Sequence, residues 1–388
     1  MKLLILSLDA YSIFHPDSGF IFGGAEVETG YHARGLAALG VAATVVTRDQ
    51  GAPAHSVDGV ALVPHPEYKG TGYWNKRKTL AGRIAFRLSG DKNPYTSAEE
   101  MFSALAPDIG YVMGTVPEAK KLAAHCRKEQ KHFVYRVAHD MDLGDGNLTD
   151  ERMKKWAGMT VAEVREIIAT ASLILVQTPL QQELLKKEFG REGVMMFPPI
   201  SLDVPDEMPG KEYDVLWIGK NNSFKRPEQL VELARKLSSR KFCMVFNKMD
   251  PESWEKIVAG LPENVHLIES VPVDKIEMLF RESRVFVSTS LHEGFANTFL
   301  QAGKNSVPVV SMGSDPNGML SVHGAGLLPG DDQERLAAAV ESLLNDATLH
   351  AKTAAAARSF VGRFHDKKVI AQQLFGLLQE LEAAPPQL

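Results

Sequence analysis

The sequence predicts an α/β fold built from two Rossmann-like halves. Short apolar runs alternate with segments of helical periodicity along most of the chain, which is the order expected of strand–helix–strand units. Near the middle, a Pro-rich stretch over residues 197–210 interrupts this alternation. A chain of 388 residues is long enough for about two domains of ordinary size. We therefore expect one domain over residues 1–200 and a second over residues 211–365.

The composition narrows the class of protein. Apolar residues make up 44% of the chain and charged residues 23%, as in a soluble globular protein, and the net charge of -5 gives no sign of nucleic-acid binding. Cys126 and Cys243 lie far apart without metal-ligand spacing, which suits a reducing compartment. The apolar run at the N-terminus ends at Asp9, too early for a signal peptide, and no apolar run approaches the ~20 residues of a membrane span. We expect a cytoplasmic protein.

The first half begins with a strand, a glycine-rich loop, a helix and a second strand. Residues 3–8 are continuously apolar, as in a parallel strand that is buried on both faces. The loop ends in Gly23 and Gly24, a helical pattern runs to about Leu39, and residues 41–47 form the next strand-like run. This order is typical of the opening of a Rossmann-like half. The glycines do not form a Gly-x-Gly-x-x-Gly fingerprint, so a tight turn alone would explain them as well as a ligand site.

Residues 64–98 are less regular and contain a basic, aromatic-flanked segment with helical character. Its members are Tyr73, Trp74, Lys76, Arg77, Lys78, Arg83 and Arg87. Such a segment could contact an anionic membrane surface or an anionic acceptor. More often it is a solvated helix face, so peripheral membrane contact through residues 73–92 is the less favoured of the two interpretations.

Polar residues follow a later strand of the first half. Residues 108–113 and 132–137 are strand-like, and the second of these runs leads into His139, Asp140 and Asp142. Side chains at the carboxyl end of a parallel strand face the ligand crevice, which makes His139 a candidate site residue. Asp140 and Asp142 also match Asp-x-Asp, a pattern in which two carboxylates hold Mg²⁺ or Mn²⁺ against a diphosphate.

The remaining segments continue the alternation in both halves. In the first half we expect a long helical stretch over 150–171, a strand over 173–176, a helix that opens at Thr178-Pro179, and a short strand over 194–197. In the second half we expect strands over 213–218, 242–246, 265–268 and 285–288, with helices to about 237 and over 251–259, 273–282 and 331–345. The last Ala-rich segment, over 347–383, is expected to be helical in two pieces.

The turn after the first strand of the second half is basic. Lys220 and Lys225 lie five residues apart around this turn, so both ammonium groups can converge on one anion. Arg226 follows directly and could add a third positive charge. Charged residues in a turn are usually only solvated, but the next motif favours a phosphate site.

The most informative stretch runs over residues 289–310. A strand-like run ends before a loop that contains Glu293 and Gly294, a helical pattern begins near Phe295, and another strand-like run follows. Gly294 lets the backbone approach a ligand closely, and the N–H groups of residues 295–298 would point at an anion placed at the helix start. Glu293 could then accept hydrogen bonds from sugar hydroxyls, and Gln301, two turns down the helix, could hold a ribose.

These motifs together resemble the donor site of retaining glycosyltransferases of the GT-B fold, in particular of family four (glycosyl transferases group 1). The family's Glu-Gly-Phe, with a second Glu eight residues after the first, corresponds here to Glu293 and Gln301. Its Gly-Arg, with a Lys five residues after the Arg, corresponds to Lys220 and Lys225, and its His-Asp pair begins at His139. Gln301 lacks the charge of the family's Glu, and Lys220 lacks the bidentate geometry of its Arg.

The resemblance implies a fold and a set of site residues. The fold would be two Rossmann-like domains facing across a cleft, with a last helix, over about 366–388, that packs back on the first domain. The implied donor-binding residues are Gly23, Gly24, Lys220, Lys225, Arg226, Ser270, Val271, Glu293, Gly294, Phe295, Ala296, Asn297, Thr298 and Gln301. The implied catalytic residues are His139, Lys225 and Glu293.

The resemblance also implies an activity, the retaining transfer of a hexosyl group from a nucleotide diphosphate sugar to an acceptor hydroxyl that the sequence does not identify. The pathway would be glycan, lipid or natural-product glycoside biosynthesis. No cofactor or metal is expected, because Lys220, Lys225 and the helix start can stabilise the diphosphate, and the Asp-x-Asp pattern lies in the other half of the chain. Two alternatives stay open, a non-catalytic nucleotide-sugar-binding subunit and a GT-B-like nucleotide-sugar epimerase.

Overall fold

The computed structural model divides the chain into two compact units, which are described separately. The first unit is Met1–Pro199 with Lys367–Leu388, and the second is Ile200–Asp366. The structure describes residues 1–18, 23–79, 84, 93–204, 209–219, 224–247, 251–269, 271, 273–290 and 295–386.

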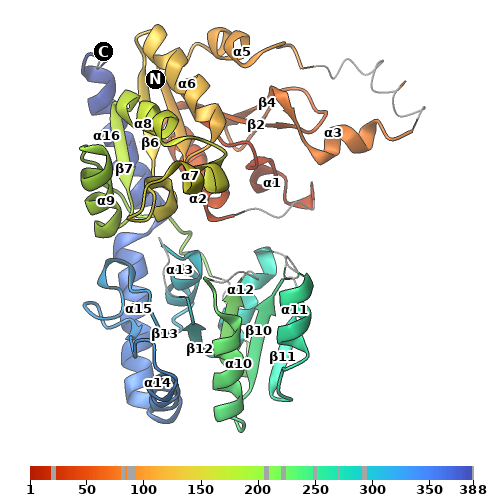
Figure 1. The fold of residues 1–388 in the computed structure, drawn as a ribbon, viewed down its shortest axis with the longest axis vertical. Helices are drawn as coiled ribbons and strands as arrows, with labels where there is room; N and C mark the ends of the chain where they lie inside the picture. The colour runs from red at the N-terminus through yellow and green to blue at the C-terminus, as the bar shows by residue number, and fades with distance from the viewer. Residues whose placement is uncertain are drawn as a thin grey trace. The chain divides into compact units, whose positions relative to one another are not determined.

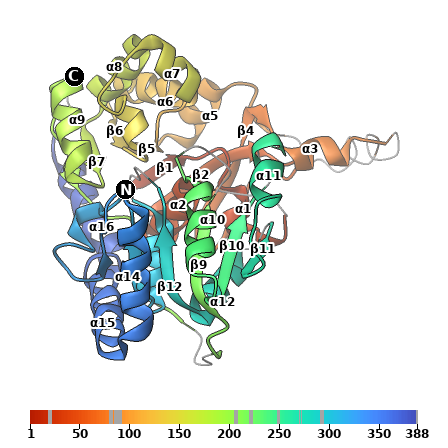
Figure 2. The same ribbon diagram turned by 60° about the horizontal axis from the view of Figure 1, so that its bottom comes forward.

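The first unit is built on an eight-stranded sheet in the order β3-β4-β2-β1-β5-β6-β7-β8 (Figures 1 and 2). The strands are β1 (Lys2–Leu6), β2 (Ala42–Asp49), β3 (His55–Val57), β4 (Val60–Lys69), β5 (Ile109–Met113), β6 (His132–Arg136), β7 (Leu173–Val176) and β8 (Val194–Met195). All neighbours are parallel except β3 and β4. From β4 to β7 this is the Rossmann strand order, which confirms the Rossmann-like half that the sequence predicted.

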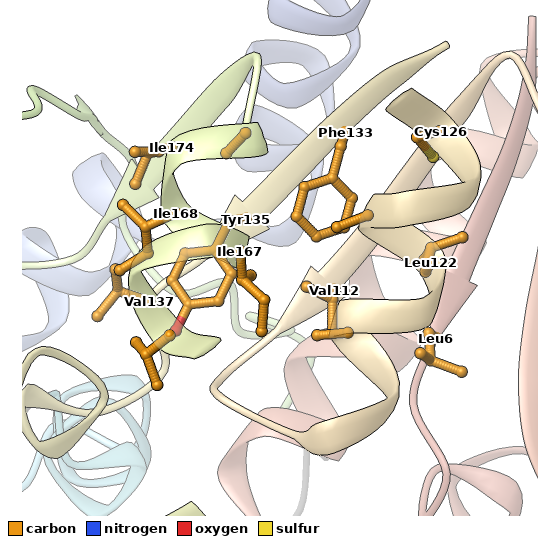
Figure 3. Close-up of a cluster of buried hydrophobic side chains, with 14 of the residues drawn as sticks. Leu6, Val112, Leu122, Cys126, Phe133, Tyr135, Val137, Ile167, Ile168 and Ile174 are labelled. Carbon is orange, nitrogen blue, oxygen red and sulfur yellow. The ribbon is translucent and has the colours of Figure 1, made fainter. Parts of the chain in front are cut away.

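Helices cover both faces of this sheet, because side chains of successive strand residues point to opposite faces. Leu4 and Leu6 of β1 belong to the core cluster shown in Figure 3, whereas Leu3 and Ile5 belong to the cluster on the other face. The first cluster is covered by α5 (Ala98–Leu105), α6 (Pro117–Lys128), α7 (Asp150–Ala157), α8 (Val161–Thr170) and α9 (Pro179–Phe189). The second is covered by α1 (Tyr11–Phe14), α2 (Gly24–Ala38) and the C-terminal α16 (Lys367–Ala383).

The C-terminal helix packs directly on α2. A Cβ atom at Gly35 would lie 2.6 Å from the Cβ atom of Ala371, so only glycine allows the two helices to approach this closely. The contact explains why α16 belongs to the first unit although it lies at the other end of the chain.

The second unit is a six-stranded parallel sheet in the order β11-β10-β9-β12-β13-β14, which is again the Rossmann order. Its strands are β9 (Tyr213–Gly219), β10 (Phe242–Phe246), β11 (Val265–Ile268), β12 (Ser283–Ser288), β13 (Val309–Ser311) and β14 (Gly326–Leu327). Its helices are α10 (Pro227–Lys236), α11 (Pro251–Val258), α12 (Val273–Glu282), α13 (Asn297–Lys304), α14 (Gln333–Asn345) and α15 (Ala347–Phe364). The two faces carry separate buried clusters, one under α12, α13 and α15 and one under α10 and α14.

Two segments of the first unit differ from the sequence-based expectation. Residues 64–69, expected to be irregular, are the second half of β4, in which Pro64 and Pro66 hide the strand pattern. These prolines are tolerated because β3 pairs with β4 only as far as Leu62, so the later part of β4 lies at the sheet edge. The helical stretch expected over 150–171 is broken into α7 and α8 at Gly158, which has a φ of +69° and ends α7.

Both cysteines are buried as free thiols. Cys126 lies in the cluster of Figure 3 and Cys243 in the second unit. Burial raises the pKa of each thiol to about 12, so neither forms a reactive thiolate near neutral pH. Among the described residues, no helix combines the length and the apolar character needed to cross a membrane.

Candidate functional site

The strand order of the second unit identifies a position for a ligand. β9 and β12 are neighbours, but the chain leaves β9 toward β10 on one side and leaves β12 toward β13 on the other. In open parallel sheets, ligands bind outside the carboxyl ends of the strands at such a switch point. Lys225 follows β9 and Thr289 follows β12, and the predicted Glu293 comes four residues after Thr289 in the chain, outside the described residues.

A buried hydrogen-bond chain joins the segments that follow β9 and β12. Thr289, directly after β12, is fully buried, and its hydroxyl donates to the backbone carbonyl of Lys225 at 2.6 Å. The indole Nε1 of Trp217 in β9 donates to the same hydroxyl at 2.9 Å. The backbone of the half-buried Lys225 is therefore fixed against the end of β12.

Arg226 has a structural role that the sequence did not predict. It precedes Pro227, the first residue of α10, in the left-handed conformation with a φ of 49°. Its side chain is buried, and Nη2 lies 2.5 Å from Oδ1 of Asp331. The hydrogen bond from Arg226 lowers the pKa of Asp331. The guanidinium thus ties α10 to the loop before α14, and its contact with a donor stays a prediction.

The helix start after Glu293 is close to its expected place. α13 begins at Asn297 rather than near Phe295, with Ala296 as its extended N-cap. Asn297 and Thr298 are half-buried at the first turn, where backbone N–H groups and the helix dipole favour an anion. Phe295 instead packs on His365 at a ring-centroid distance of 4.7 Å.

Gln301 lies one turn further along α13 and is half-buried. Among the described residues, its side-chain amide has no hydrogen-bond partner. An amide that pairs with none of its described neighbours fits the predicted contact with a ribose.

We expect that Gln301→Glu keeps the KM for the donor unchanged or lowers it, and that kcat changes little. A carboxylate accepts hydroxyl hydrogen bonds more strongly than an amide does, while Lys225 offsets its added charge. Steady-state kinetics with varied donor would measure this pattern of altered uniform binding. An unchanged KM together with a lower Tm would show that residue 301 serves helix packing and not the ribose.

His139 in the first unit caps a short 3₁₀ helix, η2 (Asp140–Leu143), at the carboxyl end of β6. Its Nδ1 accepts a hydrogen bond from the backbone N–H of Met141 at 3.0 Å. The neutral ring therefore carries its proton on Nε2 and can donate a hydrogen bond from there. Trp156 of α7 packs on the ring at 5.0 Å between centroids.

Asp142 has an internal hydrogen-bonding role in the structure. Its buried carboxylate accepts the N–H groups of Thr115, Ala138 and His139 and the indole N–H of Trp156, at 2.9–3.1 Å. Asp140 accepts from Gln181 at 3.0 Å, and burial raises its pKa. Across the described parts of the chain, no group of three or more His, Cys, Asp or Glu side chains could hold a metal ion.

The glycine loop and Val271 also have local roles. The N–H of Gly23 donates to Oε2 of Glu26 at 2.7 Å, which caps α2, and Gly24 is exposed beside it. A Cβ at Gly23 would lie 2.9 Å from that carboxylate oxygen, so glycine makes room for the cap. Val271 packs against the buried cluster under α13. Contacts of these residues with a donor stay predictions.

Four predicted site residues lie outside the described residues, namely Lys220, Ser270, Glu293 and Gly294. Conversely, the sequence analysis missed Trp217, Thr289 and Trp156, which position Lys225 and His139. The sequence shows only a Trp inside an apolar strand and a Thr after another strand. These residues point to a supporting contact only when the strand order shows that β9 and β12 are neighbours.

Comparisons with known proteins agree with this arrangement. Residues 212–346 match the family described as glycosyl transferases group 1. No curated protein matches the chain in a sequence search. Sucrose-phosphate synthase from Thermosynechococcus elongatus has a similar structure, with 14% identity and a TM-score of 0.75 over 99% of both chains.

Two other solved structures are similar over nearly their whole length. HepE from Anabaena, in complex with UDP-glucose, has 14% identity and a TM-score of 0.68 over 98% of this chain and 100% of that chain. WaaG, a glycosyltransferase involved in lipopolysaccharide biosynthesis, has 15% identity and a TM-score of 0.66 over 97% of this chain and 99% of that chain. The chain thus has the GT-B fold of two Rossmann-like units, and residues 212–346 of its second unit carry the sequence pattern of glycosyl transferases group 1.

Proposed function

We propose that the protein is a retaining glycosyltransferase that moves a hexosyl group from a nucleotide diphosphate sugar to an acceptor hydroxyl. The observation that carries this proposal is the link from Trp217 through Thr289 to Lys225, which fixes a lysine at the switch point of the second sheet. The family match of residues 212–346 supports the same location. The complex of HepE with UDP-glucose makes uridine diphosphate the first nucleotide to test.

In this proposal the second unit binds and activates the leaving group. Lys225 and the first turn of α13, at Asn297 and Thr298, stabilise the negative charge that grows on the diphosphate when the glycosidic bond breaks. Glu293 accepts hydrogen bonds from sugar hydroxyls, Gln301 holds the ribose, and Lys220 adds a second cation at the diphosphate.

The first unit contributes His139, which donates a hydrogen bond to the sugar from Nε2. A double displacement would require two carboxylates about 5 Å apart. The carboxylate next to His139, that of Asp140, accepts a hydrogen bond from Gln181, and we assign it no nucleophilic role. We therefore infer that a leaving-phosphate oxygen takes the acceptor proton on the face from which the donor leaves, which retains the anomeric configuration.

Donor binding is tested by a thermal-shift screen of nucleoside diphosphates and nucleotide sugars with the purified protein. A nucleotide that binds only the folded state raises the Tm with its concentration. We expect stabilisation by at least one nucleotide diphosphate, and slow release of sugar from the matching donor. Binding without release would favour the nucleotide-sugar-binding subunit, and formation of an epimeric nucleotide sugar would favour the epimerase.

We expect donor turnover to persist in excess EDTA, because fixed cations and the helix start take the place of a metal at the diphosphate. Initial rates with and without chelator measure this directly. Complete loss of turnover in EDTA, with recovery on addition of Mg²⁺ or Mn²⁺, would contradict the prediction. It would favour the alternative in which the Asp-x-Asp pattern at Asp140 binds a metal ion.

A further inference from the structure

The first unit contains a cavity of about 310 Å³ at the carboxyl ends of β1, β2 and β4. Its lining includes Asp9, Tyr11, Arg48, Gln50, Lys69 and Trp74. A volume near 300 Å³ is the lower end of the range for small-molecule sites. All the lining residues belong to the first unit, so the cavity is defined by that unit alone.

One wall of the cavity is a short helix, α3 (Thr71–Lys76), which lies near α1 and β4 in Figure 1. Its first turn is held by Gln50, whose Oε1 accepts the N–H of Gly72 at 2.9 Å. Its last turn is held by Lys76, whose Nζ donates to the carbonyl of Gly51 at 2.6 Å. The helix carries Trp74, whose side chain is 60% exposed and borders the cavity. An indole left this exposed on an anchored helix is available to a ligand.

The charges in the cavity are balanced in pairs. Arg48 Nε lies 2.7 Å from Asp9 Oδ1, and Lys69 Nζ lies 2.8 Å from Oδ2 of the buried Asp49. An anionic ligand would therefore meet cations whose charge is already offset and would lie close to the Asp9 carboxylate, which repels it. A neutral ligand with hydroxyl groups would not be repelled, because each hydroxyl can donate to Asp9 and accept from Arg48 at the same time.

The lining also includes Tyr11 and Ser12 of α1. Burial raises the pKa of Tyr11, so its hydroxyl stays protonated and able to donate. Ser12 is 1% exposed, and its hydroxyl has no hydrogen-bond partner in the described parts of the chain. Buried polar groups of this kind are normally satisfied by protein, water or ligand.

We propose that this cavity binds the acceptor, and that the acceptor is a neutral saccharide whose ring packs on Trp74 while its hydroxyls bond to Asp9 and Arg48. The proposal rests on the proposed glycosyltransferase function and adds the chemical class of the second substrate. A sugar ring has an apolar C–H face that suits an aromatic surface and a polar rim that suits a balanced ion pair. The carboxyl edge of the sheet, where the cavity opens, also carries His139, so acceptor and sugar-contacting histidine lie along the same edge.

The test is saturation-transfer NMR of the full chain in the presence of uridine diphosphate. The ligands are glucose, galactose, mannose, N-acetylglucosamine, sucrose and lactose, with glucose 6-phosphate and fructose 6-phosphate as anionic counterparts. We expect saturation of ring protons in at least one neutral saccharide, a loss of at least fivefold in Trp74→Ala, and partial retention in Trp74→Phe. Val369→Ala, exposed on α16 of the same unit, should keep the full signal.

Asp9→Asn distinguishes neutral from anionic ligands. It should weaken the signal of the neutral saccharide, whereas it would strengthen binding of the sugar phosphates if the free Arg48 were an anion site. Response to the phosphates alone, no response across the panel, or an undiminished signal in Trp74→Ala would overturn the proposal. Nucleotide stabilisation of the wild-type protein is measured in parallel. If it persists while the saccharide response is absent, only the acceptor assignment fails; if no nucleotide stabilises the protein, the proposed function itself fails.

Discussion

Lys225→Ala should lose donor turnover by on the order of 100-fold or more while the protein keeps its fold. In the proposed mechanism, the Lys225 ammonium meets a diphosphate whose negative charge grows as the glycosidic bond breaks, and removal of one such donor typically costs 10²- to 10³-fold in kcat. The loss should appear in both kcat and kcat/KM, because the interaction strengthens in the transition state. The measurement is steady-state release of sugar from the donor that the thermal-shift screen identifies.

The fold of this variant should survive because the hydrogen bond that links Lys225 to Thr289 uses the backbone carbonyl of Lys225. The carbonyl that accepts from Thr289 remains in alanine, so the link to Trp217 is preserved. Lys225→Arg keeps the charge and should recover part of the activity. The matched control is Lys236→Ala, which removes an exposed ion pair between Lys236 of α10 and Glu334 of α14. It should change donor turnover and stability very little. If kcat/KM of Lys225→Ala stays within a few fold of the wild-type value, the proposal that Lys225 stabilises the donor diphosphate is wrong.

The sequence predicted the strands well because most of them are buried on both faces. A parallel strand covered by helices must be apolar at every position, and runs such as Phe242–Phe246 carry that pattern without interruption. β4 was not predicted because Pro64, His65 and Pro66 interrupt the apolar run in its buried part. Beyond Leu62 it lies at the sheet edge, where Pro64 and Pro66 are allowed, and a proline normally argues against a strand.

The positions of the candidate-site loops along the sheet could be predicted from the sequence, whereas the contacts that hold them could not. Loops at the carboxyl ends of β9 and β12 could be placed from motif and strand alternation alone, and the Rossmann strand order brings their starting points together. The links between them are contacts between distant residues, such as Trp217 with Thr289, which no local pattern encodes. For the same reason Arg226 was read as a free cation, although Asp331, far along the chain, pairs with it.

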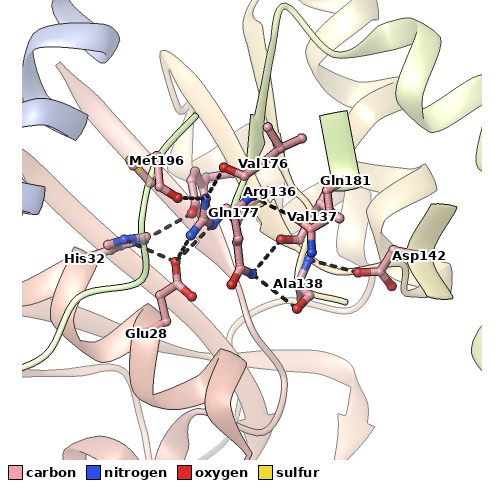
Figure 4. Close-up of polar contacts among 11 residues, drawn as sticks. Glu28, His32, Arg136, Val137, Ala138, Asp142, Val176, Gln177, Gln181 and Met196 are labelled. Carbon is pink, nitrogen blue, oxygen red and sulfur yellow. Dashed lines mark hydrogen bonds and ion pairs between the residues drawn. The ribbon is translucent and has the colours of Figure 1, made fainter. Parts of the chain in front are cut away.

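Arg136→Met should be the most destabilising single change in the first unit, by about 3–5 kcal/mol, because it leaves a buried carboxylate without its cation. Arg136 is fully buried in β6, and its Nε and Nη2 donate to Oε1 of Glu28 at 2.9 and 2.6 Å (Figure 4). Its Nη1 donates to the carbonyls of Met196 at 2.6 Å and Val176 at 3.4 Å. One side chain thus joins α2, β6, β7 and the segment after β8. Calorimetry should show a Tm lower by roughly 10 °C for a unit of this size.

The loss of unfolding free energy in Arg136→Met should be larger near neutral pH than near pH 4.5. Burial raises the pKa of Glu28 above its ordinary value of 4.5, and Arg136 opposes that rise, so the pKa goes higher still when the arginine is removed. A carboxyl whose pKa is raised in the folded state stabilises the fold below its unfolded pKa and loses this contribution as the pH rises through the folded pKa. The free energy of unfolding of the variant should therefore lie furthest below that of the wild type near neutral pH, and the difference should shrink toward pH 4.5. His32, 3.6 Å from Glu28, acts in the same direction, because loss of Arg136 favours its protonation.

Two companion variants separate the charge from the packing. Glu28→Gln keeps an acceptor oxygen for the guanidinium but leaves its buried positive charge without a carboxylate, so it should cost a similar amount, about 3–5 kcal/mol. Because a guanidinium stays protonated, this cost should not shrink toward pH 4.5 as that of Arg136→Met does. The double variant Glu28→Leu with Arg136→Met removes both charges and should be more stable than Arg136→Met alone, since an apolar pair can replace a buried ion pair. A deficit for Arg136→Met below about 1 kcal/mol, or one that stays constant from neutral pH to 4.5, would show that the buried charge of Glu28 is not what Arg136 compensates.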